Sequence, residues 1–328
     1  MGMTSGIKLT TAFIFVWAAL AVDLAHSQET DLTAWIAKLR ADAVSTGISG
    51  ATVDRAFQDF TPLARVVELD RRQPEFTLTF GQYLNRVVPQ RRVQKGRQKL
   101  AENRQILTLI GKEFGVQPRF IVALWGIETD FGRIDGGFSV IQSLATLAMD
   151  GRRSRFFRGQ LIRALRILDQ GHITLDRMRG SWAGAMGHFQ FMPSSFENFA
   201  IDYDGDGKRD IWRNKRDAFA SAANYLSRSG WRDDQTWGRR VTIPFGFDDK
   251  LLGLKIRKNM ADWQSLGVRR SDGTDLPSRN MEGSLVRAKG PNASVFLTYK
   301  NYRTILKWNR SMFFAVAVGT LADKIGGR

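Results

Sequence analysis

A glutamate among aromatic and apolar residues is the first candidate for chemistry in this sequence. Glu128 stands in the segment Ala-Leu-Trp-Gly-Ile-Glu-Thr-Asp-Phe-Gly, residues 123–132, four positions after Leu124 and three before Phe131. On a helix these spacings bring the side chains to one side. A carboxyl on such a face is poorly solvated, so we expect its pKa to rise, as a general acid at a glycosidic bond requires. Asp130 would point to roughly the opposite side, so the segment predicts one acid/base group rather than a close pair.

Two alternatives accompany this interpretation of Glu128. Arginines are frequent in this sequence, and a glutamate that pairs with one of them or caps a helix would serve structure alone. A second carboxylate from farther away, such as Asp135, would change the chemistry to that of a carboxylate pair.

A second segment combines small, polar and aromatic residues. Residues 181–196 read Ser-Trp-Ala-Gly-Ala-Met-Gly-His-Phe-Gln-Phe-Met-Pro-Ser-Ser-Phe. Small residues let a backbone approach a ligand closely. Ser181 and Gln190 can hydrogen-bond to sugar hydroxyls and acetamides, and the aromatic rings can stack on sugar faces. No aspartate is evident that would complete a Ser–His nucleophile, so we expect His188 to have a polar or packing role.

An acidic loop predicts a metal site. Acidic residues occupy positions 1, 3, 5 and 9 of an EF-hand loop, glycine stands at position 6, and a lysine offers its carbonyl at position 7. Arg213 replaces the glutamate of position 12, so the closing ligand must come from elsewhere, and Asp217 at the start of the next helix is the candidate. Carboxylates this close repel without a hard cation, which favours a structural calcium ion over an acidic surface turn. The predicted ligands are Asp202, Asp204, Asp206, Lys208, Asp210 and Asp217.

The elements that must position these residues are mostly helices up to about Arg232. Pro118 suits a first helical turn and opens a helix that runs to about Phe131. Ser139 and Gln142 form a capping box for a helix at Val140–Met149. Further helices are expected over Phe156–Leu168, Ala218–Ser227 and Tyr302–Lys324.

Between Arg239 and about Thr298 the pattern changes. Gly, Pro, Asp and Ser punctuate short apolar runs, which is typical of short strands. The expected strands are Val241–Phe247, Leu251–Ile256, Gly283–Ala288 and Ser294–Thr298. The sequence therefore predicts an α+β fold, predominantly α, with a helical core at about 90–232, a small β subdomain at about 239–298 and C-terminal helices at 300–325.

Composition and the N-terminus narrow the function class. The 328 residues contain no cysteine and three histidines, which excludes a disulfide scaffold, a zinc-thiolate site and a Cys-linked lipid anchor. A net charge of +17 favours polyanions. Residues 1–27 are typical of a secretory signal peptide, with basic Lys8, an apolar stretch and the small residues Ala25 and Ser27 before Gln28. Export favours a polymer of the cell envelope over nucleic acid as the partner, and leaves no stable membrane anchor after cleavage.

The three motifs, in this order, resemble the lytic murein transglycosylase B family (glycoside hydrolase family 103), from roughly Arg71 to Ile325. The resemblance implies a lysozyme-like helical core with flanking α and β lobes and an EF-hand-like calcium site. It implies non-hydrolytic cleavage of the β-1,4 bond between N-acetylmuramic acid and N-acetylglucosamine in peptidoglycan, with 1,6-anhydromuramic acid ends. Residues 28–328 would form one multilobed domain, monomeric and periplasmic.

The resemblance also assigns roles to residues. Glu128 falls at the family's catalytic acid/base, and Phe314 stands where relatives can carry a tyrosine. The implied substrate-binding residues are Ser181, Gln190, Arg152, Arg153, Tyr225, Asn309 and Tyr83, with the two arginines meeting acidic peptide stems. Two other functions stay open: a muramidase that hydrolyses the same bond with water, and a non-catalytic, calcium-stabilised peptidoglycan-binding protein.

Overall fold

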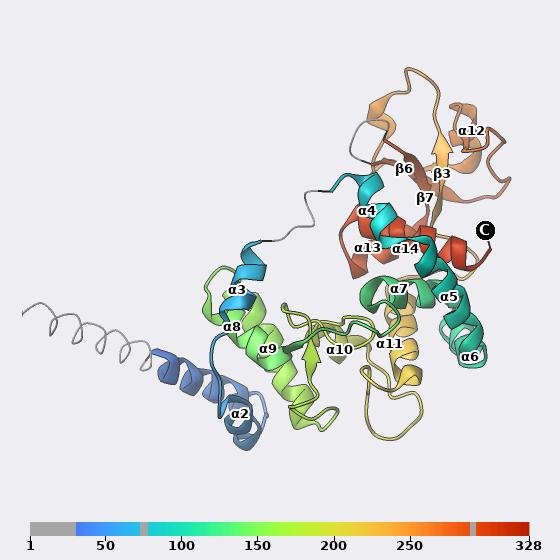
Figure 1. Ribbon diagram of the computed structural model, residues 1–328. Helices are drawn as coiled ribbons and strands as arrows, with labels where there is room; N and C mark the ends of the chain where they lie inside the picture. Colours follow the sequence, from blue (N-terminus) through green and yellow to red (C-terminus); the bar gives the residue numbers. More distant parts are fainter. Residues whose placement is uncertain (1–30, 73–77, 289–292, 328) are drawn as a thin grey trace, which may run out of the picture. The chain divides into compact units, whose positions relative to one another are not determined.

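The computed structural model describes residues 31–72, 78–288 and 293–327 (Figure 1). The predicted signal peptide, residues 1–27, lies outside these ranges. The chain forms two compact units, which divide between Thr61 and Pro62. In the first unit, residues 31–45 are helical, and α2 (Gly50–Phe57) follows with Ser49 as its N-cap.

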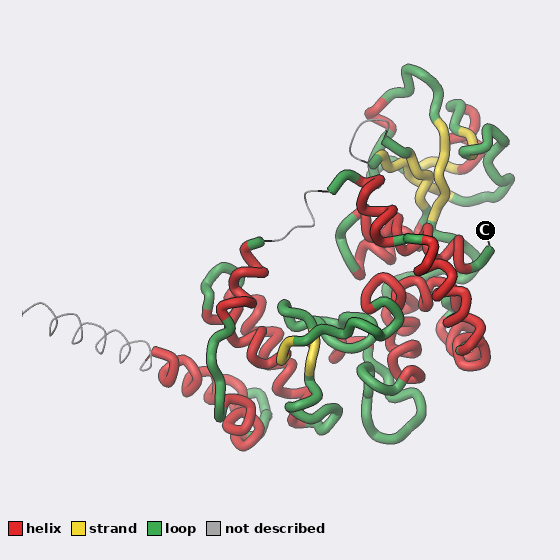
Figure 2. The backbone as a smooth tube through the Cα atoms, viewed as in Figure 1, coloured by secondary structure: helices red, strands yellow, loops and turns green. Residues whose placement is uncertain are grey.

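The second unit consists mainly of helices in its described residues, with strands in two places (Figure 2). The longer helices are α5 (Gln90–Glu102), α6 (Arg104–Phe114), α7 (Pro118–Thr129), α8 (Val140–Met149), α9 (Ser154–Asp169), α11 (Lys215–Arg228), α13 (Lys300–Trp308) and α14 (Met312–Ile325). The shorter ones are α3 (Ala64–Arg71), α4 (Phe80–Val87), α10 (Pro193–Phe199), α12 (Met260–Ser265) and the 3-10 turn η2 (Asp249–Leu251). None of the described helices combines the length and the apolar character needed to cross a bilayer.

Helix α7 is the centre of the helical part. Its residues from Phe120 to Gly126 are all buried, as expected of a helix that is apolar all round. It packs against α14, α5, α6 and α11, and Figure 1 shows it between α14 and α11. Gly126 allows close contact, because an added Cβ would come within 2.7 Å of the Phe131 ring. The expected start at Pro118 is confirmed, and the helix ends at Thr129, two residues before the expected end.

The small β subdomain is one antiparallel sheet with the strand order β4-β6-β7-β3-β5. The strands are β3 (Gly238–Thr242), β4 (Lys258–Asn259), β5 (Arg269–Arg270), β6 (Glu282–Arg287) and β7 (Val295–Thr298). Trp263 of α12 is fully buried against the sheet's apolar side chains. The predominantly α fold with a small sheet is thus as predicted, although Leu251–Ile256 contributes only a bridge from Leu252 to Leu285 and α12 was not expected.

The helical stretch expected at the C-terminus, over Tyr302–Lys324 and within 300–325, consists of two helices. The chain leaves α13 at Asn309, which has an extended backbone, and α14 restarts at Met312 with Ser311 as its N-cap. A second, two-stranded pairing joins β1 (Phe138–Ser139) to β2 (Arg179–Gly180) ahead of the segment 181–196. Both irregular stretches lie beside the site described next.

Candidate active site

A cavity of about 480 Å³ contains the glutamate singled out by the sequence. The elements around it are α4, the start of α5, the C-terminal turn of α7, the break between α13 and α14, and the first turn of α14. Its lining residues are Leu78, Tyr83, Arg86, Val87, Arg92, Ile127, Glu128, Asn309, Ser311 and Phe314. The structure therefore brings together Glu128, Tyr83 and Asn309 of the predicted site. Among the described residues that line the cavity, Glu128 is the sole carboxylate.

Glu128 is held by a tryptophan of the C-terminal helix pair. The Trp308 indole Nε1 donates a hydrogen bond of 2.8 Å to Glu128 Oε1. An indole N–H is a donor only, so this bond stabilises the carboxylate, and in the neutral acid it favours the proton on the other carboxyl oxygen. The indole is fixed in turn by aromatic rings: its centroid lies 4.6 Å from that of Tyr225 and 5.3 Å from that of Phe191.

Asp130 follows Glu128 closely and has a different role. It ends α7 in the left-handed conformation with φ 50°, and its side chain is 5% exposed. Its carboxylate accepts hydrogen bonds from Arg133 at 2.8 Å and Arg92 at 3.2 Å. Burial by itself would raise the pKa of Asp130, but the bonds to Arg133 and Arg92 outweigh it and lower the pKa. Asp130 is therefore a charged anchor for Arg92, which also lines the cavity, rather than a second acid.

The predicted residues of the segment 181–196 shape their own loop. Ser181 Oγ accepts the N–H groups of Ala183 and Ala185, and Gln190 donates from Nε2 to the carbonyls of Asp135 and Gly187. Gln190 also adopts a left-handed φ of 49°. Neither residue lines the cavity, although Phe191 of the same loop packs on the Trp308 ring that holds Glu128.

His188 has the packing role expected of it. Its Nδ1 accepts the indole N–H of Trp125, and the two rings meet edge to face with centroids 5.6 Å apart. Burial, and then the charge of Lys215, lower the pKa of His188 and keep the ring neutral.

The two arginines expected to meet peptide stems are paired within the protein. Arg152 Nε lies 3.0 Å from Asp70 Oδ2, and Arg153 also forms an ion pair with this carboxylate, which is 2% exposed. They stand at the start of α9, pair with Asp70 of α3, and are not among the residues that line the cavity. Tyr225, on α11, donates its hydroxyl to the Lys307 carbonyl at 2.8 Å, and burial raises its pKa. It supports Trp308 and does not line the cavity.

The acidic loop brings three of its carboxylates together. One oxygen each of Asp202, Asp204 and Asp217 lies within 4.8 Å of the others. Burial, opposed by two backbone hydrogen bonds and reinforced by the charges of Asp204 and Asp202, raises the pKa of Asp217 to about 6. A buried carboxyl destabilised by two like charges suits a hard cation with oxygen ligands.

The other predicted metal ligands are not in this group. Asp206 accepts the Lys208 N–H through Oδ1, and Asp210 accepts the N–H groups of Trp212 and Arg213. In this geometry the carboxylates of Asp206 and Asp210 stabilise the turns of the loop by accepting backbone hydrogen bonds. Asp217, chosen from outside the standard positions, does join the cluster.

Sequence reasoning missed Trp308, Arg86 and Arg92 as residues of the site. Trp308 directly precedes Asn309, which the sequence did single out. A helical pattern does not show which side chain contacts a distant residue, so it could not predict the hydrogen bond from Trp308 to Glu128. Arg92 could have been found from two features together: α5 has a basic face, and α7 ends in an aspartate that needs a cationic partner.

Known proteins share this architecture. A profile described as the Transglycosylase SLT domain matches residues 31–323. Membrane-bound lytic murein transglycosylase B of Escherichia coli (strain K12) is 32% identical over 220 residues, 65% of this chain. That match spans 58% of the E. coli protein's length.

Solved structures agree over most of the chain. SltB3 from Pseudomonas aeruginosa, in complex with NAG-anhNAM-pentapeptide, is 44% identical with a TM-score of 0.87, over 90% of this chain and 79% of that one. The E. coli lytic transglycosylase Slt35 in complex with calcium is 27% identical with a TM-score of 0.75, over 89% of this chain and 92% of that one.

Proposed function

Because the chain belongs to the Transglycosylase SLT domain family, we propose that it is a lytic transglycosylase of peptidoglycan. It cleaves the β-1,4 bond between N-acetylmuramic acid and N-acetylglucosamine. The observation that carries the proposal is one carboxyl, Glu128, that lines a 480 Å³ cavity and is fixed by a donor-only indole. The similar SltB3 in complex with NAG-anhNAM-pentapeptide supports this choice of substrate.

In the proposed reaction Glu128 acts twice. As a neutral acid it donates its proton to the glycosidic oxygen, while the C1–O4 bond breaks and the muramic acid C1 gains oxocarbenium character. The substrate's own 2-acetamido group assists, which would make a second carboxylate unnecessary. The Glu128 carboxylate then accepts the proton of the C6 hydroxyl, whose oxygen attacks C1 and closes the 1,6-anhydro ring. No water is consumed, and Glu128 ends protonated as it began.

The neighbours of Glu128 suit this cycle. The Trp308 N–H stabilises the Glu128 carboxylate by its bond to Oε1, so Oε2 is the oxygen that donates and accepts the proton. Arg92 and Arg86 add positive charge to the cavity wall, and Arg92 is held by Asp130. Tyr83 and Asn309 offer polar groups to the sugar, whereas Phe314 offers an apolar face.

We also propose that Asp202, Asp204 and Asp217 hold a structural calcium ion, as part of an EF-hand-like loop at 202–217. The three-carboxylate group and the raised pKa of Asp217 support this, and the similar Slt35 was solved in complex with calcium. The cation would neutralise the mutual repulsion of the group and join the loop to the start of α11.

The proposed substrate places the enzyme in the bacterial cell envelope. The predicted signal peptide, residues 1–27, would deliver it to the periplasm. Residues 28–328 would act there as a monomer on glycan strands.

Mass spectrometry of the soluble products released from purified sacculi tests the function. Wild-type protein should release anhydro-muropeptides, and Glu128→Gln should release none, because glutamine neither donates nor accepts the proton. Glu102→Gln, an exposed change at the end of α5, is the matched control and should remain active. Reducing-end products would instead identify a muramidase, and binding to sacculi without products from wild type would identify a peptidoglycan-binding protein.

A further inference from the structure

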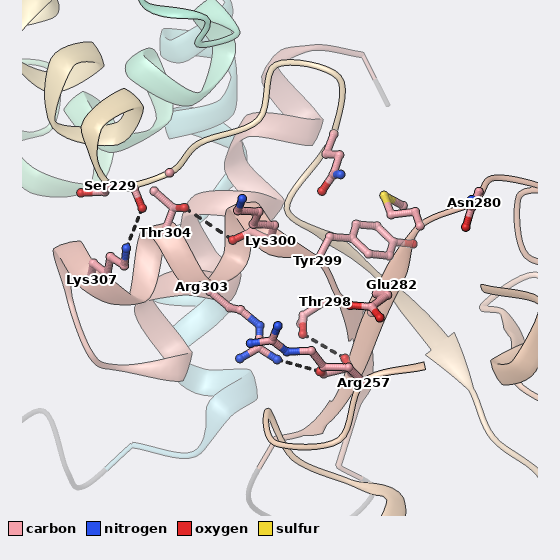
Figure 3. A pocket seen from close by; sticks show the side chains of 15 residues that line it. Ser229, Arg257, Asn280, Glu282, Thr298, Tyr299, Lys300, Arg303, Thr304 and Lys307 are labelled. Carbon is pink, nitrogen blue, oxygen red and sulfur yellow. Dashed lines mark hydrogen bonds between the residues drawn. The ribbon is translucent and has the colours of Figure 1, made fainter. Parts of the chain in front are cut away.

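A second cavity, of about 520 Å³, lies between the β subdomain and α13 (Figure 3). It shares no lining residue with the cavity of Glu128. One wall is a face of α13, the opposite wall comes from β6, β7 and the segments before them, and the loop after α11 closes the third side. Nothing in the proposed reaction uses it.

Four cations line this cavity. Lys300, Arg303 and Lys307 follow one another at spacings of three and four along α13, so they share a face of that helix. Arg257 approaches from the β subdomain, opposite that face (Figure 3). Glu282, at the start of β6, is the one acid among the described lining residues. The cavity therefore has a strong positive excess.

Two of these cations are fixed by neutral groups, and two have no partner within the described ranges. Arg303 donates to Ser284 Oγ at 2.9 Å and to the Leu254 carbonyl, and Lys307 donates to the Ser229 carbonyl at 2.7 Å. The side chains of Arg257 and Lys300 make no hydrogen bond or ion pair with the described residues.

The positive charges destabilise one another. Burial, and then the charge of Arg257, lower the pKa of Arg303, and Glu282 offsets this only in part. Arg152 and Arg153 differ from these cations, since both of them are paired with the carboxylate of Asp70. The amino end of α13, at Lys300, adds the positive end of a helix dipole to the same cavity. A bound anion would relieve all of these charges together.

We propose that this cavity binds a short acidic peptide through its carboxylates, and that this peptide is the stem carried by the glycan strand. The identification of the peptide as a stem rests on the proposed function. Guanidinium groups bind carboxylates in a two-pronged manner, which fits Arg257 and the already oriented Arg303. Glu282 would repel a polyphosphate but can accept a hydrogen bond from an ammonium group, so the site favours a peptide that carries both carboxylates and an amine.

The distance to the catalytic cavity fits the same ligand. Lys300 and Trp308 begin and end α13, eight residues apart, which is about 12 Å along a helix. Four residues of extended peptide span about 13 Å. A stem attached to a sugar near Glu128 can therefore reach the cations of α13.

Calorimetric titration of the full chain with a synthetic peptide tests this inference. The peptide carries at least two free carboxylates and one amine, and the protein carries Glu128→Gln, so that binding is independent of turnover. We expect Arg257→Gln and Lys300→Gln each to weaken binding about tenfold, or about 1.4 kcal/mol. Arg240→Gln and Lys250→Gln, exposed charge removals elsewhere in the β subdomain, are the matched controls and should change the Kd less than about twofold, or about 0.4 kcal/mol.

Each outcome decides the assignment. Unchanged binding in both cavity variants, with melting temperatures like those of the controls, would overturn it. Inorganic phosphate is the second probe: if it displaces the peptide from this cavity at equal concentration, the site is a general anion site and the peptide assignment is wrong. The proposed function is judged separately by the products from sacculi, so peptide binding that depends on Arg257 without anhydro products would reject the function and not the cavity.

Discussion

Removing the indole N–H that reaches Glu128 is the sharpest test of the site. Trp308→Phe keeps an aromatic ring against Tyr225 and Phe191 but deletes the 2.8 Å hydrogen bond to Oε1. A hydrogen bond to a charged group contributes about 1.5–3 kcal/mol. Because the donor-only indole favours the carboxylate over the neutral acid, its loss should keep Glu128 protonated to higher pH. The alkaline limb of the pH–rate profile should therefore move to higher pH.

The rate should also fall, since the second half of the proposed reaction needs the carboxylate as a base. We expect kcat on sacculi to drop about 10–100-fold near neutral pH, with KM changed much less. Product release is measured from pH 4 to 9 for wild type and variant. Trp231→Phe is the matched control, because it removes an indole N–H that donates to Gln117, remote from Glu128, and should leave the profile in place. A Trp308→Phe profile that lost rate equally at every pH would refute electrostatic support and leave a packing role.

Three further predictions concern the loop and the scaffold. Asp204→Asn should abolish the calcium-induced rise in melting temperature, whereas Asp206→Asn, which is outside the three-carboxylate group, should keep most of it; equal loss in both would favour the full EF-hand set. Asp130→Asn should cost about 2 kcal/mol at neutral pH by leaving a cluster of arginines without its anion. Because the pKa of Asp130 is lowered, this difference should shrink as the pH falls below about 4, and a constant difference in chemical denaturation would count against the ion pairs. Gly319→Ala would place a Cβ 2.2 Å from a buried indole and should lower stability by about 1–2 kcal/mol despite its helix propensity, whereas Gly159→Ala, with 3.6 Å of clearance, should not.

The sequence was most informative where local chemistry decides the structure. Pro118 and Ser139 begin helices as expected, because a first-turn proline and a serine cap act within a few residues. The apolar runs that became β6 and β7 were also recognisable. Helices were expected at 300–325, but the position of the break between them was not, because no proline or glycine marks it and only the capping residue Ser311 signals a new start.

That break is what completes the candidate site. It lets α13 end with Trp308 on Glu128 and lets α14 begin with Ser311 and Phe314 on the cavity wall. In a continuous helix each residue is rotated by 100° from the one before, so Asn309 would lie on a different side from Trp308 and Ser311. The irregular backbone beside Glu128 therefore positions the side chains of the candidate site, and Ser311, which caps α14, fixes where the second helix begins.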